Sequence, residues 1–589
     1  MRRVVLAILL GTLAALPAAA LDRKAFTFTR YDLQLIVDPH QHGLAVEGEV
    51  TVRNASRLPQ REVVLQISSS LRWLSILANG AEAEWLEQSY TSDIDHTGLL
   101  HEAIVKLHRP IAPGDSLRLT VRYSGTVNKD ATRLERIGTP AEVARRSDWD
   151  EISDFFTALR GAGFVVWYPV AMDAANLAQG NELFDTLRDW RERERSALLR
   201  VHVSKVPLPE GDGSRFAFVT NGSATANGSA GKAGAAITEE FPGVDPVIVL
   251  ISDPAETTDR PRVAAYYTAA HTSFARDYMV AAEAVIPPLE EWFGTPNGKV
   301  VLVELTDPNA LPYDAGPFYF VPMRQVSRAA AEVALVRPVV HTMVESPRPW
   351  ISEGLASFAQ ALMRERQGGR RAAFLYLGQF SSALAVAEAQ SYSPLPVSET
   401  AGKGIPTQPP TSGLQSLITT ADEIFFRTKA AHVWWMLRDM VGDRVLQSAL
   451  SNYRAADDID TAYMQRLIET QLPAKRDLET FFDDWVYRDR GLPQLRVDSA
   501  YVRNTLREQT VTAVTIENLG DAWCEVPVAV RSANGENTVR VVVPAKGKTI
   551  VRVPFESVPR EAEVNDGSVP EAEHRDNVIQ VTTAPPARR

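Results

Sequence analysis

Two short stretches decide how this sequence is interpreted: Arg337-Pro338-Val339-Val340-His341 and Trp350-Ile351-Ser352-Glu353-Gly354-Leu355-Ala356-Ser357-Phe358. On a helix, residues four apart lie on one face, so positions 337 and 341 can face a common point. Position 341 is a histidine, whose neutral imidazole can bind a metal ion, whereas the guanidinium of Arg337 stays protonated and cannot bind a cation.

The pattern Trp-x-x-Glu-Gly-x-Ala-x-Phe at 350–358 resembles the third-ligand helix of the gluzincins, specifically the aminopeptidase N-type zinc metallopeptidases. In that family an H-E-x-x-H helix supplies two histidine ligands and the general base, and a later glutamate, carried by a second helix, completes the zinc site. The resemblance therefore implies His341 and Glu353 as the residual metal ligands. Further motifs follow in the family's order: Trp167-Tyr168-Pro169-Val170, Lys429-Ala430, Trp434-Trp435-Met436-Leu437-Arg438 and Gly491-Leu492-Pro493. The resemblance implies a multidomain α+β protein with an N-terminal antiparallel, saddle-like β domain, a central mainly helical, thermolysin-like domain and a C-terminal β-sandwich.

The hydrophobic pattern divides the chain in the same way. Apolar and polar residues alternate within 26–125, which predicts antiparallel strands. Helical patterns dominate about 327–490, and shorter helices are expected at 139–160 and 262–289. Short β segments separated by Gly, Asn and Asp return from 494. We therefore expect a signal peptide at 1–20 and domains at 21–257, 258–492 and 493–585.

The first twenty residues have the features of a signal peptide. Arg2 and Arg3 precede an apolar run at 4–16, and Ala18-Ala19-Ala20 offers a small-residue cleavage site. We expect an exported protein, periplasmic or secreted, which would be membrane-anchored if the segment stays uncleaved. The apolar run is shorter than the roughly 20 residues of a transmembrane helix, and we expect no other membrane span.

Composition excludes several other classes of protein. The 589 residues include 62 Lys and Arg against 73 Asp and Glu, a net charge of −11, and there are no long basic runs. Nucleic-acid binding is therefore not expected. Cys524 is the single cysteine, which excludes an internal disulfide and any multi-cysteine metal cluster.

The H-E-x-x-H motif of the family is degraded here, in either of two registers. In the first register Arg337 and Pro338 replace the first histidine and the general-base glutamate, and His341 is the retained second histidine. In the second register His341 is the first ligand, Thr342 replaces the base and Glu345 replaces the second histidine. The spacing to the later glutamate favours the first register. Neither register places a general base in its usual position.

Two other positions depart from the family pattern. The family's Gly-x-Met-Glu-Asn loop holds the amine of the substrate, and the comparable stretch, 311–318, keeps only Asp314 and Gly316 as cleft candidates. A tyrosine that stabilises the transition state precedes a Lys-Gly pair in the family. Phe426 and Arg427 lie in the comparable stretch here, and a phenylalanine has no hydroxyl to stabilise an oxyanion.

These departures favour a pseudopeptidase that binds peptides or proteins in the former catalytic cleft, with no cofactor. The alternative is an active zinc metallopeptidase, an aminopeptidase with the atypical ligands His341, Glu345 and Glu353. Two hypotheses stay open for Arg337. Its guanidinium can take the metal position and pair with Glu353, because an uncompensated buried carboxylate is costly. Alternatively, Pro338 distorts the helix and turns Arg337 towards solvent.

Overall fold

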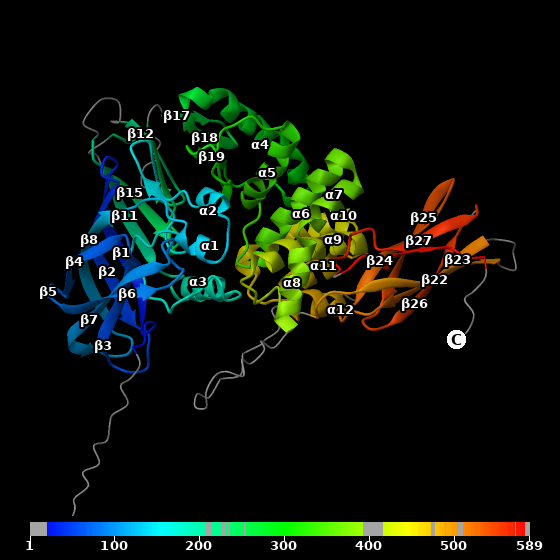
Figure 1. Ribbon diagram of the computed structural model, residues 1–589, viewed down its shortest axis with the longest axis horizontal. Helices are drawn as coiled ribbons and strands as arrows, with labels where there is room; N and C mark the ends of the chain where they lie inside the picture. Colours follow the sequence, from blue (N-terminus) through cyan, green and yellow to red (C-terminus); the bar gives the residue numbers. More distant parts are fainter. Residues whose placement is uncertain are drawn as a thin grey trace, which may run out of the picture.

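The computed structural model describes residues 21–207, 215–224, 231–232, 236–252, 255–392, 416–472, 478–488, 490–504, 510–555, 557–571 and 573–583. The expected signal peptide lies outside these residues. Figure 1 shows a β-rich N-terminal part, a mainly helical central part and C-terminal strands side by side. Within the described part of the chain, no helix is both long and apolar enough to cross a membrane.

The N-terminal part is built on an eight-stranded sheet with the order β13-β15-β11-β1-β2-β8-β4-β5. Its strands are β1 (Phe26–Asp38), β2 (Gly43–Asn54), β4 (Leu71–Ala78), β5 (Ala81–Glu82), β8 (Ser116–Thr126), β11 (Leu198–Lys205), β13 (Ser223–Ala224) and β15 (Ile237–Pro242). The predicted alternation is present, because Leu33, Leu35 and Val37 of β1 are fully buried between more exposed neighbours. One pairing differs from the antiparallel prediction, since β1 runs parallel to β11.

Two smaller sheets and three helices complete this part. One sheet has the order β3-β7-β6 and the other β14-β12-β16-β10-β9. Their bounds are β3 (Gln60–Ser68), β6 (Glu84–Thr91), β7 (Leu99–Ile111), β9 (Glu151–Ile152), β10 (Phe156–Leu159), β12 (Arg215–Thr220), β14 (Gly231–Lys232) and β16 (Ile248–Ser252), with helices α1 (Thr132–Arg136), α2 (Ala141–Ser147) and α3 (Glu182–Arg193). The helix expected over 139–160 is therefore correct only for α2, because β10 pairs with β9 and β16.

The central part contains a five-stranded sheet, β17-β18-β19-β21-β20, and most of the helices. Its strands are β17 (Ala255–Asp259), β18 (Val263–Thr268), β19 (Val300–Glu304), β20 (Tyr313–Ala315) and β21 (Phe318–Val321). The first helices are α4 (Thr272–Phe293), α5 (Arg328–His341), α6 (Pro349–Gly368), α7 (Arg370–Leu377) and α8 (Ser381–Tyr392), with 3-10 turns η1 (Ala269–His271) and η2 (Gly378–Phe380). The later ones are the π-helix η3 (Ile424–Lys429), α9 (Ala430–Val441), α10 (Asp443–Asn452), η4 (Ala455–Asp457), α11 (Tyr463–Gln471), α12 (Glu479–Phe482) and the π-helix η5 (Asp483–Tyr487).

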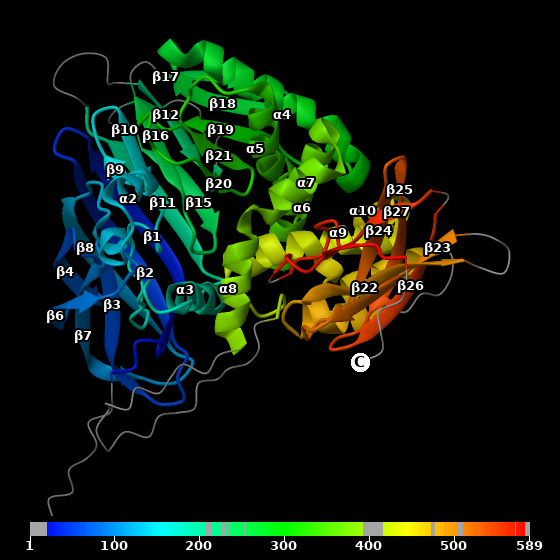
Figure 2. The same cartoon turned by 45° about the vertical axis from the view of Figure 1, so that its right-hand side comes forward.

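The start of this part corrects the helix predicted over 262–289. Residues 263–268 form β18, which pairs with β17 on one side and parallel to β19 on the other. Val263, Ala265 and Tyr267 are buried on one face of the strand, and the helix α4 begins only at Thr272. Figure 2 shows this sheet between the N-terminal strands and α4. The expected domain boundary at 257/258 falls inside β17.

Helix α5 continues through Pro338 to His341, so the proline does not break it. Proline lacks an N–H and therefore removes one intrahelical hydrogen bond. Because Pro338 lies in the last turn, the rest of the ladder is unaffected, and Ser327 caps the helix start by accepting a hydrogen bond from the Ala330 N–H.

The C-terminal strands form two antiparallel sheets. The first has the order β22-β23-β26 and the second β25-β24-β27-β28. Their bounds are β22 (Leu495–Asn504), β23 (Thr510–Asn518), β24 (Cys524–Ser532), β25 (Gly535–Val543), β26 (Lys548–Pro554), β27 (Pro559–Val564) and β28 (Val578–Gln580). Their buried side chains join those of the central helices in one hydrophobic core, and the Trp485 indole N–H donates to the Trp523 carbonyl at 2.8 Å. A separate cluster links the N-terminal and central sheets through Trp149, Phe156 and Phe320.

Candidate functional site

The candidate site lies where four elements of the central part meet. The edge strand β20 carries Asp314, helix α5 carries Arg337 and ends at His341, helix α6 carries Glu353, and η3 carries Arg427. These five residues are called the Arg337 cluster below. The secondary structure fixes three of them on helices that pack against one another and against the sheet, so the cluster sits on a rigid frame.

The motif at 350–358 fixes the position of α6. The Trp350 and Trp434 rings stack with their centroids 5.0 Å apart, and the Trp434 indole N–H donates to the Trp350 carbonyl at 3.1 Å. At position 354 a Cβ atom would lie only 2.7 Å from the Cβ of Ala430, so Gly354 allows α6 to approach α9 closely. The stacked Trp350 and the small Gly354 together allow this close packing, which places Glu353 opposite the end of α5.

Each nitrogen of the Arg337 guanidinium contacts a neighbouring side chain. Its Nε donates to Asp314 Oδ2 at 3.1 Å, and its Nη1 donates to Ser357 Oγ at 2.9 Å. Its Nη2 pairs with Glu353 Oε2 and lies 3.1 Å from Asp314 Oδ2. The side chain is only 8% exposed. Of the two hypotheses for this residue, the ion pair with Glu353 is therefore present, and the solvent-facing alternative is wrong.

A second guanidinium supports the same carboxylate. Arg427 Nε donates to Glu353 Oε2 at 3.2 Å, and Arg427 Nη1 lies 3.1 Å from Glu423 Oε2. Arg427 is one-third exposed and faces a cavity, whereas Arg337 is enclosed. Glu353 is thus compensated by cations from two different elements.

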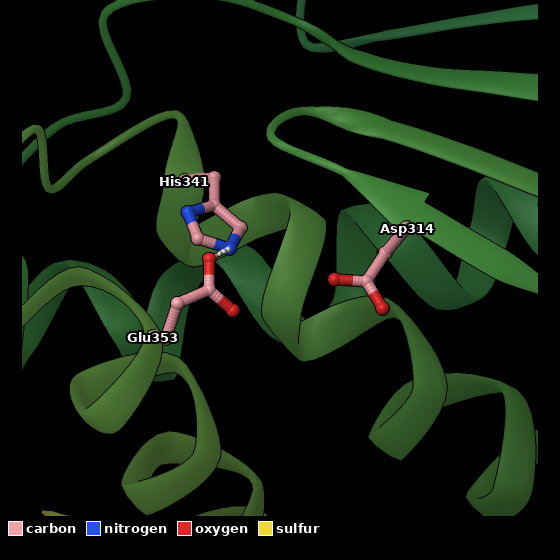
Figure 3. A group of neighbouring side chains, drawn as sticks. All are labelled: Asp314, His341 and Glu353. Atoms are coloured by element: carbon pink, nitrogen blue, oxygen red, sulfur yellow. Dashed lines mark ion pairs between the residues drawn. The ribbon is translucent and has the colours of Figure 1, made fainter. Parts of the chain in front are cut away.

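His341 faces the other oxygen of the same carboxylate. Its Nε2 lies 3.3 Å from Glu353 Oε1, without hydrogen-bond geometry, and this buried nitrogen has no hydrogen-bond partner. Figure 3 shows Asp314, His341 and Glu353 pointing towards a common space. Burial lowers the pKa of His341, and the charge of Arg337 lowers it further against the opposing effect of Glu353. The imidazole is therefore neutral at neutral pH.

Both carboxylates of the cluster are ionised. Burial alone would raise the pKa of Asp314 and of Glu353, but the adjacent Arg337 charge outweighs it and lowers both values. In return, although burial opposes its charge, the two carboxylates raise the pKa of Arg337 above its already high ordinary value. The cluster is a set of fixed charges across neutral pH, with a neutral imidazole at its side.

The residues do not fit a bound zinc ion while Arg337 keeps this position. Asp314, His341 and Glu353 each offer a ligand atom, and these atoms lie within 4.8 Å of one another, as a metal site requires. However, Arg337 Nη2 contacts both carboxylates, so it already supplies the positive charge in the space between them. Glu345, the ligand of the second register, is exposed and is not part of this group among the described residues.

A cavity of about 250 Å³ opens beside Arg337 and Arg427. It is lined by Asp314, Arg337, Ser357, Gln360, Tyr376, Leu377, Gln379, Phe380, Arg427, Thr428 and Ala431. The Tyr376 hydroxyl donates to Gln360 Oε1 at 2.7 Å, and burial raises the pKa of Tyr376, so this phenol stays protonated. The lining combines the charged side chains of Asp314, Arg337 and Arg427 with neutral hydrogen-bonding groups and apolar side chains.

A second cavity, of about 540 Å³, lies on the other side of Glu353. Its wall includes Gly316, His341, Glu345, Ser352 and Glu353. Glu353 and Arg337 therefore stand between two hollow regions that together form the candidate cleft.

Most of the cleft candidates chosen from sequence line these cavities. Asp314 and Arg427 line the first cavity and Gly316 lines the second, whereas Phe426 lines neither and packs against the hydrophobic core. Pro338 is buried within α5.

Sequence reasoning missed several polar residues of the first cavity, among them Ser357, Gln360 and Tyr376. Ser357 follows Glu353 by four positions on α6, so helical spacing was a sufficient signal. Gln360 and Tyr376 are joined by their hydrogen bond across two helices, and no local pattern marks that contact.

No family model and no curated protein matches this sequence. Solved structures of M1 zinc metallopeptidases are similar to it. A variant from Deinococcus radiodurans is 20% identical with a TM-score of 0.40, and the match covers 77% of this chain and 92% of the other. A variant from the same organism bound to a Tyr-Ser-Ala substrate is 19% identical, with a TM-score of 0.41 and coverage of 77% and 92%. A two-domain M1 zinc metallopeptidase variant bound to L-arginine is 18% identical, with a TM-score of 0.42 and coverage of 76% and 91%. Similarity at this level carries no argument about the activity of this chain.

Proposed function

We propose that this protein is an exported pseudopeptidase, which binds a peptide or protein segment in the cleft beside the Arg337 cluster without hydrolysing it. The observation that carries the proposal is the contact of Arg337 with both Asp314 and Glu353. A guanidinium does not lose its proton at physiological pH and cannot activate water as a metal ion does. The site therefore holds charge without generating a nucleophile.

The absence of hydrolysis follows from the groups that remain. A hydrolytic site needs a general base near the attacked bond. The carboxylates of Asp314 and Glu353 are held by Arg337, which lowers the pKa of both and makes them poor proton acceptors. Position 338 is a proline, which has no side-chain base.

The cavities support binding of a polypeptide. Peptide groups need both donors and acceptors, and side chains need apolar contact. The first cavity offers Gln360, Gln379 and Tyr376 beside Leu377 and Phe380. The second cavity, which Glu353 also lines, offers a further volume of about 540 Å³ beside the cluster.

Two further parts of the proposal concern the flanking regions. We infer that residues 1–20 direct export, which follows from their basic start, apolar run and small-residue end. We also infer that the two C-terminal sheets form the β-sandwich implied by the family resemblance. The burial of Val526, Val528 and Val530 in the common core supports this arrangement.

The alternative is an active zinc metallopeptidase. The mutual reach of Asp314, His341 and Glu353 favours it, because three such ligands are enough for a catalytic zinc ion with one open position. It requires Arg337 to leave both carboxylates, which would break the contacts that each nitrogen of this buried guanidinium makes.

The test measures binding and cleavage on the same samples. A library of fluorescent peptides is screened with the mature protein by fluorescence anisotropy, and each mixture is then analysed by mass spectrometry. We expect saturable binding with intact peptides, weakened at least tenfold in Tyr376→Ala. Leu375→Ala is the matched control, because Leu375 lies next to Tyr376 on α7 and is 70% exposed.

Two results would contradict the proposal. Cleavage that a chelator and His341→Ala both abolish would establish the metallopeptidase alternative. Peptides that neither bind nor are cleaved would reject both functions for this cleft.

A further inference from the structure

Beyond peptide binding, the structure contains a cation site that one of its own side chains blocks. We propose that Asp314, His341 and Glu353 form a divalent-cation site closed by Arg337, and that shortening this arginine opens the site to zinc. The inference concerns the same cluster but does not depend on any peptide ligand. Native protein and the opened variant are expected to differ in metal binding only because of this one side chain.

The ligand geometry is already in place. Asp314 comes from the edge strand β20, His341 from the end of α5 and Glu353 from α6 (Figure 3). Their ligand atoms lie within 4.8 Å of one another, so one ion can reach all three with small side-chain adjustments. Because three separate elements hold the ligands, loss of one side chain does not dissolve the arrangement.

The chemistry of these ligands suits zinc. One imidazole and two carboxylates are common zinc ligands, and a fourth position remains for water. His341 Nε2 is buried and has no hydrogen-bond partner, so this nitrogen is available to a metal without breaking an existing hydrogen bond. A magnesium ion prefers six oxygen ligands in octahedral geometry and is expected to bind more weakly to this set.

Arg337 is what excludes the ion from the native protein. Its Nη2 lies against both carboxylates, and its side chain is 8% exposed, so it fills the space as well as neutralising the charge. Truncation at Cβ would leave two adjacent carboxylates and an empty volume between them. Arg427 contacts Glu353 only through Oε2, at 3.2 Å, and leaves Oε1 facing His341.

The purified full chain is titrated with zinc in an isothermal titration calorimeter, and its thermal unfolding is measured with and without zinc. Native protein, R337A, R337M and the double variant R337A/H341A are compared. R337A should bind one zinc ion per chain at least 100-fold more tightly than native protein and unfold at a higher temperature with zinc than without it. R337M keeps the bulk of the side chain without its charge and should bind less tightly than R337A. R337A/H341A should lose the binding.

Two outcomes with folded R337A reject the proposal. Folded R337A that binds zinc no better than native protein would overturn it, as would binding that survives in R337A/H341A. If R337A does not fold without metal, recovery on refolding with zinc but not with magnesium supports the site, and failure to recover with zinc rejects it. Peptide binding by native protein is a separate measurement, so failure of either idea can be distinguished.

Discussion

The double-mutant cycle of Arg337→Met with Glu353→Gln should show strong coupling in stability. Removing one partner of a buried ion pair typically costs about 3–5 kcal/mol, because the other charge is left uncompensated. The Arg337 side chain is 8% exposed, but Glu353 is 22% exposed and keeps Arg427 as a second partner, which argues for the lower end of this range. We expect R337M to lower the free energy of unfolding by about 3 kcal/mol. When residue 353 is already glutamine, the same substitution should cost about 1–2 kcal/mol less, and this difference is the coupling energy.

The assay is urea denaturation of the four proteins, monitored by intrinsic fluorescence. Because a chain with several structural parts does not have to unfold in one step, the cycle is evaluated on the transition that shifts in R337M, with the same m value in all four proteins. Arg328 and Glu332 provide the matched control on the same helix, since their N···O distance is 2.8 Å and Arg328 is 69% exposed although Glu332 is only 17% exposed. That pair should show coupling below about 0.5 kcal/mol. Additive effects for Arg337 and Glu353, or a coupling no larger than the control, would refute a buried pair at this site.

Three further predictions concern other positions. Gly354→Ala should destabilise the protein by about 1–3 kcal/mol in the same assay, because its Cβ would collide with Ala430, and an unchanged midpoint would contradict the close packing of α6 on α9. Burial lowers the pKa of His96, but its hydrogen bond to Asp148 and the charges of nearby carboxylates outweigh burial and raise the pKa from 6.5 to about 9. The protonated imidazole therefore stabilises the fold fully below pH 6.5, and this stabilisation is lost as the pH rises through 9. The deficit of H96Q should therefore shrink by on the order of 3 kcal/mol between pH 6 and pH 10, and a pH-independent deficit would contradict it. Burial raises the pKa of Glu239 from 4.5 to about 7, and both of its carboxylate oxygens lack hydrogen-bond partners. E239Q should therefore be more stable than native protein at pH 8 by on the order of 3 kcal/mol and equal to it near pH 4.5, and lower stability at pH 8 would contradict this.

The sequence predicted those features of the fold that depend on local pattern. Alternation along β1 predicted a strand because each second side chain is buried against one face of a sheet. The segment 263–268, by contrast, is a strand inside the helix predicted over 262–289. This segment is a strand because it pairs with β17 and β19. The sequence did not predict β17, and β19 lies beyond the whole of α4 in the chain.

The candidate site was predictable to a similar extent. The interval of four between Arg337 and His341 placed them on one helix face, and the motif around Glu353 placed the carboxylate opposite. Asp314 was identified as a cleft residue, but its contact with Arg337 depends on where β20 lies relative to α5. No local spacing contains that information. Tyr376 was missed for the same reason, because its role in the cavity depends on the packing of α7 against α6.

The zinc content of the native protein tests most directly whether Arg337 has taken the place of a metal ion. Protein produced in zinc-supplemented medium and purified without chelators is measured by elemental analysis, with His341→Ala prepared in parallel. We expect far less than one zinc per chain in both proteins, because Arg337 already compensates Asp314 and Glu353. Close to one zinc per chain in the native protein, lost in His341→Ala, would contradict the account.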